Sequence, residues 1–99
     1  MLDRDFFLGF IKIHILHHAS EGPVYGVEMV EELGRHGYRL GPGTLYPTLH
    51  RMHEEGYLER SSKVVDGKVR KYYTITGKGL QALEESRKKI RELVDEVLE

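Results

Sequence analysis

The sequence contains no cysteine, no tryptophan and no long hydrophobic run. Without cysteine the chain can form no disulfide framework, no thiolate metal site and no thiol nucleophile. Its longest apolar stretch, residues 6–16, is interrupted by Lys12 and His14, whereas a membrane span needs about 20 unbroken apolar residues. The preceding residues, Leu2-Asp3-Arg4-Asp5, are not the basic start of a signal peptide, so no signal peptide and no membrane partner are expected, and the cytoplasm is the predicted location.

The chain also lacks an excess of either charge. Its 99 residues carry 15 basic and 16 acidic side chains, and 39% of the positions are hydrophobic. This composition indicates a folded domain rather than a disordered chain, and the net charge of -1 does not by itself favour nucleic acid as a partner. The length allows one domain with a small core, so a second copy is expected to cover apolar surface that remains.

Helical patterns fill the first half of the chain. The first predicted helix runs from its N-cap Asp3 to about residue 18 or 19, before the helix-breaking pair Gly22-Pro23. It is apolar around most of its circumference, so we expect burial on two sides, one of them against a partner subunit. A second helix is predicted over residues 25–35. Its inward residues are predicted to be Val27, Val30 and Leu33.

A third helix is predicted over about residues 44–55. Thr44 is a suitable N-cap, and Pro47 would then occupy the third helical position, where no intrahelical hydrogen bond is lost. The inward face is predicted to consist of Leu45, Leu49 and Met52. The opposite face carries Tyr46, Pro47, His50 and Arg51.

A β-hairpin is predicted next, because residues 57–65 and 68–76 flank the strong turn signal Asp66-Gly67. The two-residue loop sets a register in which Leu58 pairs with Ile75, Lys63 with Arg70, Val64 with Val69 and Val65 with Lys68. Thr76 can cap a last helix that runs to about residue 98.

The order of the predicted elements indicates a mainly α (α+β) fold. Residues 1–76 would form a winged helix-turn-helix DNA-binding domain with a two-stranded β-wing. Residues 77–99 would form a long C-terminal dimerisation helix that belongs to the same compact unit.

The net charge hides an uneven distribution. Residues 1–33 sum to -4, residues 34–71 to +4 and residues 72–99 to -1. The positive segment coincides with the third helix and the ribbon, the elements that meet DNA in a winged helix. Lys63, Lys68 and Arg70 share one face of the ribbon, where like charges repel and DNA phosphates would compensate them. Basic residues on an exposed ribbon can also serve to prevent strand addition and keep the protein soluble, so these charges favour DNA binding only together with the order of the elements.

Three stretches resemble the PadR-type transcriptional regulators. The most specific is residues 43–58, which contains Gly43-Thr44-Leu45-Tyr46-Pro47, and the others are residues 21–26 and residues 67–76 with Gly79. The resemblance covers nearly the whole chain. It implies a homodimeric winged-helix repressor that binds a palindromic operator, in the subfamily with a single C-terminal helix.

The resemblance also implies roles for residues on these stretches. Tyr46, with Thr44 and Arg51, would contact the operator, and the wing would hold the DNA backbone. The complete predicted DNA-binding set is Tyr25, Gly43, Thr44, Tyr46, Pro47, His50, Arg51, Lys63, Lys68, Arg70 and Lys71. Free N–H groups at the start of the third helix would suit a phosphate.

The last helix carries an apolar seam with spacings of three and four residues, interrupted by Arg87. Packing of one amphipathic helix on its own domain explains the seam, but the surplus apolar surface of the first helix favours a shared dimer interface. The predicted interface residues are Phe6, Phe10, Ile13, Leu80, Leu83, Arg87, Ile90, Val94 and Val97.

Two groups of histidines lie outside these predictions. His14, His17 and His18 are spaced i, i+3, i+4, and His50 and His53 are spaced i, i+3. His14 and His18 could share a metal ion on one helical face, but the sequence indicates no third ligand, so neither a metal nor a cofactor is predicted. Solvated or hydrogen-bonded histidines and a pH-sensitive interface are the alternatives.

The predicted function is sequence-specific regulation of transcription on double-stranded DNA, not enzymatic catalysis. The pairs Glu54-Glu55 and Glu84-Glu85 point to different helical faces, and no nucleophile–base set or phosphate loop is present. A winged-helix module that docks protein or RNA is the alternative. PadR-type regulators often sense small aromatic or amphipathic compounds between subunits, so a small hydrophobic or aromatic effector is an open expectation. Some of them line that cavity with Trp, which this chain lacks.

Overall fold

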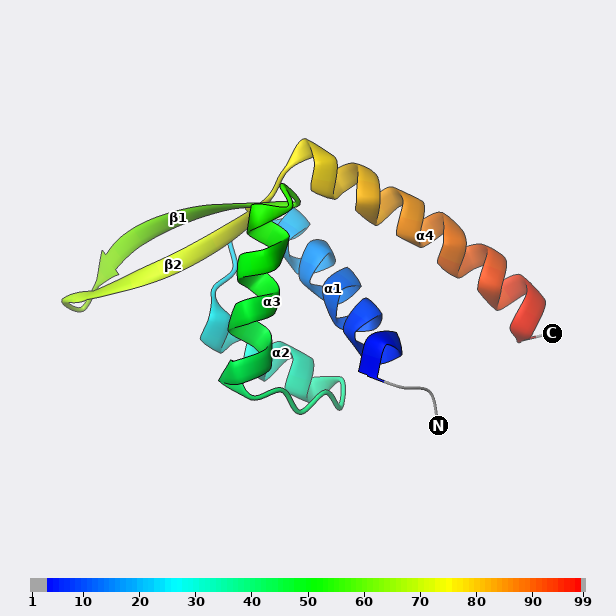
Figure 1. Cartoon of the computed structure of the whole chain (residues 1–99), viewed down its shortest axis with the longest axis horizontal. Helices are drawn as coiled ribbons and strands as arrows, with labels where there is room; N and C mark the ends of the chain where they lie inside the picture. Colours follow the sequence, from blue (N-terminus) through cyan, green and yellow to red (C-terminus); the bar gives the residue numbers. More distant parts are fainter. Residues whose placement is uncertain (1–3, 99) are drawn as a thin grey trace.

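The computed structural model describes residues 4–98, with Pro42 described by its backbone alone. The elements in chain order are α1 (Arg4–Glu21), α2 (Gly26–Arg35), α3 (Pro42–Glu54), β1 (Leu58–Val65), β2 (Lys68–Ile75) and α4 (Gly77–Val97). The β1–β2 ribbon projects from one end of the α1–α3 body, and α4 leaves in the opposite direction (Figure 1). This order confirms the predicted winged helix-turn-helix with a long last helix. Within residues 4–98, no helix combines the length and the apolar character that a membrane span requires.

The core lies where α1, α2, α3 and the base of the ribbon meet. The buried side chains are Ile11, Ile15, Leu16, Ala19, Val24, Met29, Leu33, Leu45, Leu49, Met52, Leu58, Tyr73 and Leu83. The predicted inward face of α3 is therefore confirmed. On α2 the prediction for Val27 is wrong, because this side chain is 56% exposed while Met29 is buried. Gly26, Met29 and Leu33 form the buried face of α2, and Val27 points away from this face.

The helix boundaries differ from the prediction at two places. α1 continues to Glu21, and its predicted N-cap Asp3 lies outside the described residues. α3 begins at Pro42 with Gly41 as its N-cap, so the prediction that Thr44 caps this helix is wrong. A proline is favoured at the first helical position, which explains the earlier start. Pro47 consequently lies inside the helix, where its missing N–H removes one intrahelical hydrogen bond.

The ribbon has the predicted register. Leu58 pairs with Ile75, and Lys63 pairs with Arg70. Asp66 and Gly67 have φ angles of 50° and 77°, as a two-residue type I′ turn requires.

A short β-bridge ties the ribbon to the rest of the domain. The N–H of Val24 donates to the carbonyl of Tyr73 at 2.9 Å, and the N–H of Tyr73 donates to the carbonyl of Val24 at 2.8 Å. This bridge joins the connection between α1 and α2 to the outer edge of β2.

The first turn of α4 is packed tightly on the base of the ribbon. Thr76 caps the helix as predicted, because its hydroxyl accepts a hydrogen bond of 3.0 Å from the N–H of Gly79. A Cβ on Gly79 would lie 2.3 Å from the carbonyl oxygen of Tyr57 and 2.7 Å from Cγ1 of Ile75. Glycine at this position therefore sets how closely α4 approaches the ribbon. Beyond Leu83, the residues of α4 are exposed or half-buried.

Candidate nucleic-acid interface

Helix α3 meets the base of the ribbon (Figure 1), and its exposed side chains are polar and aromatic. Tyr46, Pro47, His50 and Arg51 are exposed on one face of the helix, as the sequence predicted. Leu45 and Leu49 on the opposite face are completely buried. Since the core holds the inward face, the outward side chains have a defined direction.

Tyr46 packs against the start of α2. A Cβ on Gly26 would lie 2.1 Å from Cε1 of the Tyr46 ring and 2.7 Å from its hydroxyl oxygen. The absence of a side chain at Gly26 therefore creates the space in which this ring lies. Tyr46 is still 44% exposed, so part of the ring remains available to a partner.

A groove of about 720 Å³ lies between α3, the start of α2 and the ribbon. Six residues of the predicted DNA-binding set line it, namely Tyr25, Tyr46, His50, Lys68, Arg70 and Lys71. Arg60 also lines the groove and was missed by the sequence reasoning. The register contained the signal, because Ser62 pairs with Lys71 and Arg60 lies two residues away on the same face of the ribbon.

The remaining predicted residues lie elsewhere on the same side of α3 or on the ribbon. Pro47, Arg51 and Lys63 are exposed but do not line the groove. At the start of α3, Pro42 has no N–H, and the N–H of Thr44 donates to the carbonyl of Gly41 at 3.1 Å. The first turn consequently offers fewer donors than predicted, and Gly43 carries the N–H best suited to a phosphate.

The ribbon face that carries Lys63 and Arg70 also carries aromatic rings. The guanidinium carbon of Arg70 lies 4.4 Å from the centre of the Tyr25 ring, and Nζ of Lys63 lies 5.7 Å from the centre of the Tyr72 ring. The two rings are 5.5 Å apart in an edge-on arrangement. A side-chain hydrogen bond to Tyr72 raises the pKa of Arg70 above its ordinary value. The rings therefore offset part of the repulsion between the basic side chains of the ribbon, in addition to any contribution from DNA phosphates.

A second groove, of about 680 Å³, lies between α1 and α4 and is mainly apolar. It is lined by Phe6, Phe10, Ile13 and Ile90 of the predicted dimer interface, together with Leu93. Leu80, Val94 and Val97 are exposed on α4 outside this groove, and Arg87 pairs with Glu84 at 2.5 Å. The assignment of Leu83 to the interface needs correction, because Leu83 is 2% exposed and belongs to the core of its own chain.

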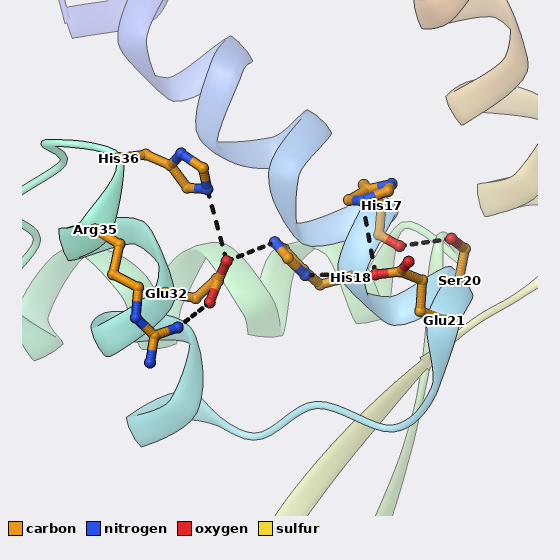
Figure 2. A network of polar contacts seen from close by, with 7 residues as sticks. All are labelled: His17, His18, Ser20, Glu21, Glu32, Arg35 and His36. Atoms are coloured by element: carbon orange, nitrogen blue, oxygen red, sulfur yellow. Dashed lines mark hydrogen bonds and ion pairs between the residues drawn. The ribbon is translucent and has the colours of Figure 1, made fainter.

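The two groups of histidines have different surroundings. On α3, Nε2 of His50 lies 2.7 Å from Glu54, and Nδ1 of His53 lies 3.1 Å from the carbonyl of Leu58, so these two rings do not converge. Figure 2 shows that His17 and His18 of α1 lie next to Glu21, while Glu32 of α2 lies between His18 and His36. His14, His18 and His36 have ring nitrogens within 4.8 Å of one another.

The chain matches known regulators over most of its length. Residues 15–85 match the family described as "Transcriptional regulator PadR-like family". A transcriptional regulator of Mycobacterium tuberculosis is 48% identical over 95 residues, which cover 96% of this chain and 89% of that relative.

Solved structures agree with this relationship. A PadR-family regulator from Eggerthella lenta superposes with a TM-score of 0.80 at 34% identity, covering 90% of this chain and 79% of the other. A PadR-like regulator from Bacillus cereus superposes with a TM-score of 0.75 at 38% identity, covering 92% and 93%. All of these relatives are named as regulators of transcription, a function that acts on DNA. The chain therefore belongs to the PadR-like family of transcriptional regulators.

Proposed function

We propose that this regulator is a homodimeric repressor that binds a palindromic DNA operator through α3 and the ribbon. The observation that carries the proposal is the groove in which Tyr46 and His50 of α3 face basic side chains of the ribbon. Most of the residues that line this groove belong to the segment 34–71, which carries the local charge of +4. Aromatic and cationic side chains on a helix and an adjacent ribbon suit a duplex, whose bases and phosphates lie side by side.

The proposed contacts divide into two kinds. Tyr46, Arg51 and His50 lie on the face of α3 that would enter the major groove, where an arginine can pair with the edge of a guanine. Thr44 and Pro47 flank them on the same helix, and Tyr25 and Gly43 lie close to the helix starts. The basic residues of the ribbon, which are Arg60, Lys63, Lys68, Arg70 and Lys71, would contact phosphates and fix the register.

The proposed dimer interface is the apolar surface between α1 and α4. Phe10 and Ile90 are 36% and 37% exposed on either side of the groove, and Val94 and Val97 extend the surface along α4. A twofold axis through this surface would present two α3 helices to successive major grooves, about 34 Å apart. A small hydrophobic effector would bind in the part of this groove that the second subunit leaves open. The proposed compartment is the cytoplasm, where such a regulator meets its DNA.

Selection from a pool of random duplexes tests the proposal. The purified chain should enrich an inverted repeat, and the half-site separation should match the distance between the two α3 helices. The double variant Tyr46→Ala/Arg51→Ala should lose the enrichment while its oligomeric state is unchanged. Arg91→Ala removes the same charge from the exposed side of α4 and serves as the control.

Failure to enrich any sequence would contradict the proposed function. Retention on heparin without a preferred duplex would then favour the alternative, a winged-helix module that docks protein or RNA.

A further inference from the structure

A cluster of histidines joins α1 to the end of α2, on residues that the proposed DNA interface does not use. His14 and His18 are four residues apart and therefore lie on one face of α1. His36 is the C-cap of α2. The ring of His36 stacks on that of His14, with ring centres 4.8 Å apart.

The backbone turn after α2 holds His36 in this position. The N–H of His36 donates to the carbonyl of Leu33 at 3.1 Å, and the N–H of Tyr38 donates to the same carbonyl at 2.9 Å. Gly37 adopts a φ of 86°, which allows the chain to turn back directly after the helix. The third imidazole is thus brought to α1 by a defined turn.

The donor atoms of the cluster lie close together. The ring nitrogens of His14, His18 and His36 lie within 4.8 Å of one another. Oε1 of Glu32 lies 3.5 Å from Nε2 of His18 and 3.6 Å from Nε2 of His36. Two ligands of a tetrahedral zinc ion are about 3.3 Å apart. The contacts of Glu32 with both rings are too long for good hydrogen bonds, but they are close to this separation.

Neighbouring charges leave the donor atoms free for a cation. Arg35 pairs with Oε2 of Glu32, so Oε1 remains directed at the two imidazoles (Figure 2). Oε1 of Glu21 lies 3.8 Å from Nδ1 of His18, on the side of the ring away from Glu32. A carboxylate on this side of the ring is placed to accept from Nδ1 once the side chains close on an ion, which would direct the other nitrogen of His18 at the metal.

Burial, followed by the nearby rings of His36 and His18, lowers the pKa of His14. A neutral imidazole keeps the lone pair that a metal ion needs.

We propose that His14, His18 and His36, together with Glu32, bind a divalent transition-metal ion of the zinc type. Three imidazoles and one carboxylate make a tetrahedral donor set that suits Zn²⁺, and imidazole also accepts Ni²⁺ and Cu²⁺. The ion would connect α1 to the first helix of the helix-turn-helix.

A neighbouring set of residues supplies the matched control. His17, His18 and Glu21 also have donor atoms within 4.8 Å of one another, but this set lies entirely on α1 and contains only two imidazoles. The proposed site requires His36 and does not require His17. His17→Gln and His36→Gln are therefore a matched pair, and His36 at the end of α2 is itself 47% exposed, so its replacement should not disturb the core.

The test is calorimetric titration of the chelator-treated full chain with Zn²⁺ alone, with the fold of each variant checked by circular dichroism. We expect one ion per chain, an affinity that falls about tenfold or more in His36→Gln and His14→Gln, and no change in His17→Gln. Co²⁺ in place of Zn²⁺ should give the visible absorption of a tetrahedral site. Equal binding by the wild type and His36→Gln would overturn the proposal, as would loss of binding in His17→Gln alone. DNA binding is not a readout here, so failure of this site would leave the proposed function intact.

Discussion

The ring of Tyr46 occupies the space that a side chain at position 26 would need. A Cβ on Gly26 would lie 2.1 Å from Cε1 of that ring, far inside van der Waals contact. Tyr46 is 44% exposed, so rotation of its ring toward solvent is the least costly way to make room. Gly26 on α2 therefore sets the direction in which the tyrosine of α3 faces the groove.

The first prediction concerns this pair. Gly26→Ala should turn the Tyr46 ring away from the groove and weaken operator binding about tenfold, or about 1.4 kcal/mol. Fluorescence anisotropy with the selected operator measures the effect. Gly34→Ala, on the exposed side of the same helix with nothing within 4 Å, is the control and should bind normally. In a double-mutant cycle, Gly26→Ala should add little to Tyr46→Ala, and full additivity would contradict the coupling.

The second prediction concerns the start of α4. Gly79→Ala would place a methyl group against the backbone of Tyr57, which cannot move without shifting the ribbon. We expect a loss of about 1–3 kcal/mol in the free energy of unfolding, measured with urea. Gly77→Ala on the same turn meets nothing within 4 Å and should be neutral or slightly stabilising. Equal stability of the two variants would show that α4 does not depend on this close approach.

The third prediction concerns the proposed dimer interface. Val94→Glu would introduce a carboxylate into the apolar surface of α4, where it would be buried without a partner. The dimer dissociation constant should rise about a hundredfold or more, as measured by analytical ultracentrifugation. Val64→Glu makes the same change on the ribbon, where Val64 is 72% exposed, and should leave the dimer intact. An unchanged dimer dissociation constant in Val94→Glu would show that the interface does not include this part of α4.

The fourth prediction separates the roles of the basic residues. Arg60→Ala or Lys71→Ala should weaken binding to all duplexes and reduce the slope of log affinity against log salt by about 0.9. Arg51→Ala should instead relax the preference at one position of the operator, by about 1–3 kcal/mol. Binding to variant operators at several salt concentrations measures both effects. An equal loss of affinity for all operator variants in Arg51→Ala would show that this arginine contacts a phosphate and not a base.

Features determined by adjacent residues were predictable from the sequence. Asp66-Gly67 admits one tight turn, and this turn determines every pair of the ribbon. Thr76 is followed three residues later by the N–H that it caps. The start of α3 was harder, because Thr44 and Pro42 both favour a helix start and the proline prevailed.

Features that depend on packing between distant segments were not predictable. His36 is eighteen residues from His18, and only the packing of α2 on α1 brings the two rings together. The apolar seam of α4 was only partly predictable for a similar reason, because the spacing of its residues does not show whether each one packs within its own chain or against a second subunit. Leu83 is covered by its own core, whereas Val94 is left for another surface.

The β-bridge between Val24 and Tyr73 fixes the base of the ribbon to the helical body, so the ribbon moves together with that body. The bridge attaches Tyr73 to the connection between α1 and α2. From Tyr73 to Lys68 at the tip, the extended strand spans about 17 Å. By simple geometry, a tilt of about 6° at the bridge would move the tip by about 2 Å, enough to break a hydrogen bond to a phosphate. The position of the ribbon tip thus depends on the packing of α1 against α2. A small rotation between these two helices would become a larger displacement at the tip, where the ribbon would contact the duplex.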